Sequence, residues 1–166
     1  MFSAFDDILL NIMIDMEVQE GSSDQVIIKH VQNKYKELPT NYAKYCIANR
    51  RKEWARTLLE NYHSLSSWGA YSYDWEFWGE PNHKYKIYRD VPAGFFLKMM
   101  LEEALGVYGE REPEIRALLV LKYIEPCGVS IEEIKQLFRI CNDTVYNWLD
   151  KGLLDIGRIM AKEDAN

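Results

Sequence analysis

The side chains best suited to chemistry in this sequence lie between Glu132 and Lys151, where amides, acids and a phenol alternate with basic residues. An asparagine amide can bond the edge of adenine in the major groove, and a carboxylate can accept a hydrogen bond from cytosine. Arginine and lysine can bind backbone phosphates. On an exposed helix start, such residues would form a DNA-reading face. The candidates are Lys135, Arg139, Asn142, Asp143, Tyr146, Asn147 and Lys151.

A second set of charged side chains occupies one side of a predicted helix. Residues 29–56 hold eight basic and two acidic residues, a net charge of +6, whereas residues 1–28 hold six acids and no lysine or arginine, a net charge of −6. The basic face can bind nucleic-acid phosphate or an acidic protein surface. It can equally pair with the acidic N-terminal helix of the same chain, and both interpretations stay open. The patch comprises Lys44, Arg50, Arg51, Lys52 and Arg56.

Aromatic residues alternate with polar ones from residue 68 to residue 88, on either side of the turn-forming GEPNH sequence. This pattern predicts a short β-hairpin or an aromatic-rich structured loop. Aromatic rings can stack on single-stranded nucleic acid, but this segment has three acids and no lysine or arginine before Lys84. A protein-contact surface or a second small core therefore fits the segment better.

The composition excludes several classes of protein. A chain of 166 residues with 48% hydrophobic residues and a net charge of −6 is expected to fold rather than to stay disordered. Three cysteines without CxxC spacing indicate reduced thiols, and no signal peptide or membrane span is expected. Glycine loops for phosphate, nucleophile elbows and histidine–carboxylate metal motifs are absent. We expect a cytoplasmic binding protein, with no enzymatic activity, no cofactor and no metal.

Helical spacing of apolar residues runs through most of the chain and predicts six or seven helices in a mainly α-helical bundle. Two glycines, Gly106 and Gly109, are expected to end the helix that follows residue 96. The chain is divided into an N-terminal region, residues 1–95, with the basic helix and the aromatic segment, and a C-terminal region, residues 96–166. Ser3 with Asp6 predicts the start of the first helix, and one face of that helix carries Phe5, Ile8, Leu9, Ile12 and Met16.

Two helices joined by a short turn are predicted between Ser130 and Met160. Ser130 and Glu133 have the spacing of a capping box, in which each side chain satisfies a backbone donor at the helix start. Apolar residues on both sides of the turn predict a buried cluster in which the two helices cross steeply, as in a helix-turn-helix. That cluster is expected to contain Ile134, Phe138, Ile140, Val145 and Trp148.

Three residues depart from the usual helix-turn-helix pattern. Lys135 stands where a small residue is common, so its stem must extend toward solvent. Arg139 replaces a glycine that commonly adopts the left-handed conformation, at a cost of about 1 kcal/mol or more. Cys141 is a poorer N-cap than serine.

The segment EIKQLFRICNDTV, with the preceding EIRALLVLKYIEPCGVSIE, resembles the C-terminal helix-turn-helix of sigma factors and their relatives. Joined to an unrelated N-terminal half, it is similar to phage late-gene regulators, including Q-type antiterminators and regulators of autolysin control. This resemblance implies a phage DNA-binding transcription regulator, an antiterminator of late genes in a bacterial host. Its implied partners are double-stranded DNA and RNA polymerase, including the sigma factor.

Within this resemblance, Asn142, Tyr146 and Asn147 would contact bases, and Arg139 and Lys151 would contact phosphates. The alternative is a protein-binding inhibitor or regulator of a host factor that uses a degenerate helix-turn-helix. The oligomeric state is left open.

Overall fold

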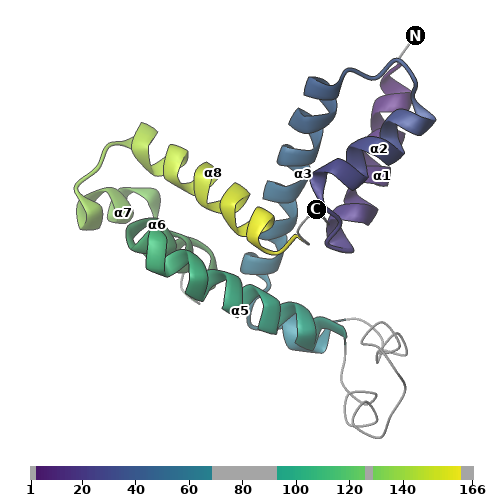
Figure 1. Cartoon of the computed structure of the whole chain (residues 1–166). Coiled ribbons are helices and arrows are strands. Elements are labelled where there is room, and N and C mark those ends of the chain that lie inside the picture. Colours follow the sequence, from purple (N-terminus) through teal and green to yellow (C-terminus); the bar gives the residue numbers. More distant parts are fainter. Residues whose placement is uncertain (1–2, 69–92, 126–128, 162–166) are drawn as a thin grey trace, which may run out of the picture.

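The computed structural model describes residues 3–68, 93–125 and 129–161, and the regular structure within these ranges is entirely helical (Figure 1). The mainly α-helical class is therefore confirmed for this part of the chain. Its seven α-helices are α1 (Ala4–Gln19), α2 (Asp24–Lys34), α3 (Thr40–Glu60), α5 (Ala93–Arg111), α6 (Pro113–Leu119), α7 (Ile131–Phe138) and α8 (Asn142–Ile159).

Two short helical turns complete the described structure. A 3-10 turn, η1 (Leu65–Ser67), follows α3, and a π-helical turn, η3 (Val120–Ile124), extends α6. The hairpin or loop predicted for residues 68–88 falls outside the described ranges except for Trp68, which packs against the C-terminal core. None of the described helices is long and apolar enough to cross a membrane.

Helix α1 begins as its sequence predicts, with a reciprocal cap. Ser3 Oγ accepts a hydrogen bond from the Asp6 amide at 3.2 Å, and Asp6 Oδ2 accepts one from the Ser3 amide at 2.9 Å. The hydrophobic stripe noted in the sequence does not form the core, however. Its members Phe5, Ile8, Ile12 and Met16 are 51–67% exposed. The inward face consists of Leu10, Ile14 and Val18.

The long helix α3 connects two hydrophobic cores. Its first half, through Ala43 and Ile47, closes an N-terminal core with α1 and α2. Its second half, through Leu58 and Leu59, enters a C-terminal core formed with α5, α6, α7 and α8. Figure 1 shows α1 and α2 beside the first half of α3 and α8 crossing toward its other half. The predicted division at residue 95 stays a prediction.

Two glycines allow α8 to pack closely against its neighbours. A Cβ atom at Gly152 would lie 2.8 Å from Ile115 of α6, and one at Gly157 would lie 2.9 Å from the carbonyl oxygen of Arg51 in α3. Contacts this short leave no room for a side chain. These two positions therefore fix the distance of α8 from α6 and α3.

The expectation that glycines end α5 is wrong. The helix continues through Gly106 and Gly109 to Arg111, and Pro113 then starts α6. Glycine in a helix interior costs only about 1 kcal/mol relative to alanine. Burial of Leu101, Leu105 and neighbouring side chains offsets that cost.

Candidate nucleic-acid interface

Helix α7 starts at a side-chain cap. Ser130 Oγ accepts a hydrogen bond from the Glu133 amide at 3.1 Å and donates one to Glu133 Oε1, also at 3.1 Å. The acidic residues Glu132 and Glu133 in the first turn also interact favourably with the helix dipole. The predicted start of this helix is confirmed, but only half of the predicted capping box forms. Glu133 accepts its bond from the Ser130 hydroxyl instead of the Ser130 amide.

The turn between α7 and α8 depends on one left-handed residue. Arg139 has φ 55° and ψ 47°, and it is the one described residue other than glycine with a positive φ. The Ile140 amide then donates to the Lys135 carbonyl at 3.2 Å, which closes the end of α7. Cys141 caps α8 in an extended conformation, without a side-chain bond to the helix amides.

A compact apolar wedge holds the two helices at this turn. Ile134 and Val145 are fully buried, and the rings of Phe138 and Trp148 meet edge to face with centroids 6.5 Å apart. Ile140 packs against the same core. The predicted cluster and the separation of residues 132–148 into two helices are therefore confirmed.

The start of α8 presents a polar face to solvent. Asn142, Asp143 and Asn147 are exposed, and Tyr146 is 57% exposed. Figure 1 shows α7 and the start of α8 at the opposite end of the molecule from α1 and α2. Nothing else in the described structure covers this face, so a ligand as large as a DNA duplex can approach it.

The three cations among the candidate DNA-reading residues, Lys135, Arg139 and Lys151, differ in their surroundings. Lys135 lies 3.3 Å from Glu132 on the same helix, with a partly covered side chain. Arg139 is exposed and forms no ion pair within the described residues. Arg139 is therefore the cation most available beside the start of α8.

Lys151 belongs to a polar network that connects α8 with the end of α5. Its Nζ donates to Asp155 at 2.9 Å and to Glu112 at 3.4 Å, and the Asp155 bond raises the pKa of Lys151. Tyr108, whose ring lies near Lys151, donates a hydrogen bond from its hydroxyl to Asp155 at 2.9 Å. Burial is the larger cause, and this hydrogen bond the second, of a Tyr108 pKa raised to about 12. The i, i+4 spacing of Lys151 and Asp155 could have predicted their pairing, whereas Glu112 and Tyr108 give no such signal.

One acid on the exposed side of α8 is neutralised by α3. Lys52 Nζ lies 3.0 Å from Asp150 Oδ1, which joins positions 98 residues apart. Asp150 would otherwise add negative charge beside the reading face. The predicted patch residue Lys52 thus affects the charge of α8 through its ion pair with Asp150.

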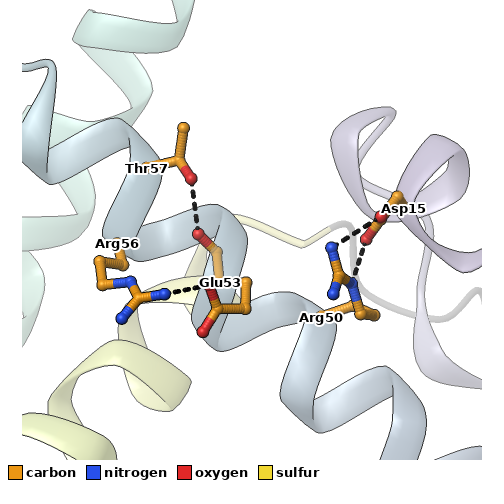
Figure 2. Close-up of polar contacts among 5 residues, drawn as sticks. All are labelled: Asp15, Arg50, Glu53, Arg56 and Thr57. Carbon is orange, nitrogen blue, oxygen red and sulfur yellow. Dashed lines mark hydrogen bonds and ion pairs between the residues drawn. The ribbon is translucent and has the colours of Figure 1, made fainter. Parts of the chain in front are cut away.

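The remaining members of the basic patch mostly bind acids of the same chain. Arg50 donates from Nε and Nη2 to the Asp15 carboxylate at 2.5 and 2.8 Å, and Arg56 pairs with Glu53, one turn away (Figure 2). Among the patch residues, Lys44 alone is exposed and forms no ion pair with the described part of the chain. The structure thus favours pairing within the chain over a free basic surface, although only Arg50 and Arg51 pair with acids of the N-terminal helices.

Arg51 lies inside the protein rather than on the predicted patch. Its side chain is 2% exposed, and it donates to Asp24 at 2.8 Å and to the Ser22 carbonyl at 2.7 Å. The helical pattern predicted that Arg51 shares an exposed face with Lys52, but in the structure α8 packs over Arg51 at Gly157. Its guanidinium thereby links the middle of α3 to the start of α2.

Cys141 is the exposed thiol of the interface. A hydrogen bond with Thr144, 3.2 Å from its sulfur, lowers the pKa of the Cys141 thiol. The described residues contain no group of three or more histidine, cysteine or acidic side chains able to hold a metal ion.

Comparison with protein families identifies a relative of this unit. Residues 113–162, which include α6, η3, α7 and α8, match the family model for the helix-turn-helix of IS630-type elements, described as a transposase. The match covers less than a third of the chain. Comparisons with curated proteins and with solved structures gave no match.

This match overturns the resemblance to sigma factors and Q-type antiterminators. The assignment to phage late-gene antitermination is therefore wrong, and the match favours DNA over the protein-partner alternative. The features behind that resemblance, a capped helix, a tight turn and an apolar wedge, are needed by every helix-turn-helix. They identify the fold of the unit but not its lineage.

Proposed function

We propose that this chain binds double-stranded DNA through α7 and α8, with the start of α8 in the major groove. The observation that carries the proposal is the similarity of residues 113–162 to a transposase helix-turn-helix. The exposed polar start of α8 supports it, because the major groove of B-DNA is about 12 Å wide and admits one helix.

In this proposal Asn147 lies at the centre of the contact. It is exposed on the side of α8 away from the wedge, with Asp143 one turn before it. Asn142 and Tyr146 lie at one border of the same face. Asn147 would bond a base edge, most favourably adenine, and Asp143 would accept a hydrogen bond from cytosine.

Phosphate contacts in the proposed complex begin with Arg139. Lys135 and Lys151 can bind phosphates only if their ion pairs with Glu132 and Asp155 break or are shared with the phosphate, so these two lysines contribute less to the affinity. Residues 113–162 carry seven basic and seven acidic side chains, a net charge of zero. Two or three phosphate contacts would give a slope of about −2 to −3 for log affinity against log salt.

The proposed role is recognition rather than chemistry. The family match covers a helix-turn-helix alone. The proposal is therefore limited to the binding of DNA.

The test is fluorescence anisotropy with a labelled pool of mixed-sequence duplexes, titrated at several salt concentrations. Two isosteric variants add the same charge at exposed helical positions, Asn147→Asp in α8 and Asn33→Asp in α2. Loss of one base contact is worth about 1–3 kcal/mol, so Asn147→Asp should weaken binding by roughly fivefold to a hundredfold. Asn33→Asp should change affinity by less than about threefold, since α2 lies far from the proposed contact.

Equal losses in the two variants would mean that net charge alone governs binding, which contradicts recognition by α8. Absence of salt-dependent binding to any duplex would contradict the proposal as a whole.

A further inference from the structure

Helix α8 is longer than the groove that its first turns are proposed to enter. It has 18 residues and is therefore about 27 Å long, whereas the major groove of B-DNA is about 12 Å wide. Since the groove curves around the duplex, only part of a helix this long can stay inside it. The second half of α8 must lie either over a phosphate backbone or away from the DNA, and its side chains indicate which.

The outward face of this second half ends at an exposed cation. Eleven residues make about three helical turns, so Arg158 lies on the same side of α8 as Asn147, roughly 16 Å farther along the helix. Lys151 and Leu154 lie between them on the same face and complete a row. Arg158 is exposed, and its guanidinium forms no ion pair with the described part of the chain.

The acids near this row are already neutralised within the protein. Asp150 borders the row, where a free carboxylate would repel phosphate, but Lys52 Nζ of α3 lies 3.0 Å from its Oδ1. Asp155 is likewise bound, by Lys151 at 2.9 Å. Arg158 is thus the one charged side chain in the second half of α8 without a partner among the described residues.

We propose that α8 lies lengthwise against the duplex and that Arg158 binds a phosphate beyond the groove. The inference rests on the proposed DNA binding and adds to it the orientation of α8 and a second contact with the backbone. Phosphates of one strand are spaced by about 3.4 Å along the duplex axis, so the row from Asn147 to Arg158 spans at most about five of them.

The test is fluorescence anisotropy of the full chain with a labelled pool of mixed-sequence duplexes at several salt concentrations. Arg158→Gln should lower the steepness of log affinity against log salt by about 1, the effect of losing one phosphate contact. Arg158→Lys keeps the charge and should leave the slope unchanged. The matched control is Lys29→Gln, which removes one positive charge from an exposed site on α2 and should also leave the slope unchanged.

The salt slope separates this contact from a structural role of the same residue. Arg158 stands in the last turn of α8, where a cation also interacts favourably with the helix dipole. Loss of that interaction lowers the melting temperature, which circular dichroism measures, but it does not change the number of phosphates bound.

The ion pair beside the row gives an independent check. Lys52→Gln leaves the Asp150 carboxylate without its cation and should weaken binding about twofold to fivefold, because an unbalanced acid then faces the backbone. The double variant Lys52→Gln/Asp150→Asn should regain the wild-type affinity.

An unchanged slope in Arg158→Gln, with binding intact, would overturn the lengthwise orientation and leave DNA recognition by the start of α8 in place. Equal losses of slope in Arg158→Gln and Lys29→Gln would also contradict the contact, since net charge would then explain both. Unchanged affinity in Lys52→Gln would place the second half of α8 away from the duplex. Absence of salt-dependent binding in the wild type would overturn the proposed function and this inference together.

Discussion

Replacement of Arg139 by glycine should stabilise the protein while weakening its binding to DNA. Arg139 occupies the left-handed region at φ 55°, where a residue with a Cβ atom loses about 1–2 kcal/mol. Glycine removes that strain but adds about 0.5–1 kcal/mol of chain entropy cost. The net gain should be about 0.5–1 kcal/mol, or roughly 1–4 °C in Tm for a domain of this size.

The same substitution removes the most available cation beside the start of α8. In the proposed complex, loss of one phosphate contact lowers the slope of log affinity against log salt by about 1. Thermal unfolding followed by circular dichroism measures the first effect, and anisotropy at several salt concentrations measures the second. Arg139→Lys, which keeps both the charge and the strained backbone, should change neither by much.

Two results would refute this reasoning. A less stable Arg139→Gly protein would mean that the arginine side chain contributes packing that outweighs its backbone strain. A more stable protein with an unchanged salt slope would remove Arg139 from the DNA contact.

Two further predictions concern packing and thiol reactivity. Gly157→Ala should destabilise the protein by about 1–3 kcal/mol in urea unfolding, because the new Cβ would lie 2.9 Å from the α3 backbone. Gly106→Ala is the control: its new Cβ would have no atom within 4 Å, so this variant should be more stable by up to about 1 kcal/mol. Equal effects of the two substitutions would contradict the close packing of α8. Iodoacetamide near neutral pH should modify Cys141 much faster than Cys46, since a hydrogen bond lowers the pKa of the first thiol and burial raises that of the second. Thr144→Val should slow the reaction of Cys141, as measured by peptide mass spectrometry, and an unchanged rate would show that the Thr144 hydrogen bond is unimportant.

Local features of the structure were predictable from the sequence. A helix cap depends on residues three apart, so Ser3 and Ser130 marked the starts of α1 and α7. The wedge around Ile134 and Trp148 was predictable for a similar reason, because a short turn leaves the apolar side chains on both helices few partners. The exposure of Asn147 followed from the same periodicity.

Features that depend on distant parts of the chain were not predictable. Both faces of α1 are apolar, and the positions of α2 and α3 decide that Leu10 is buried and Ile12 exposed. Arg51 is buried because α8 packs over it, and Lys52 meets Asp150 across 98 residues of sequence. The lineage of the helix-turn-helix was also beyond the residue pattern, since unrelated families share the same turn physics.

The measurement that tests the central claim most directly is amide NMR of the labelled full chain during titration with duplex DNA. The account predicts that the largest shift changes fall between Arg139 and Asn147, at the turn and the start of α8, and that the amides of α2 change little. Changes concentrated in α1 to α3, or none at all when DNA is added, would contradict recognition by this helix-turn-helix.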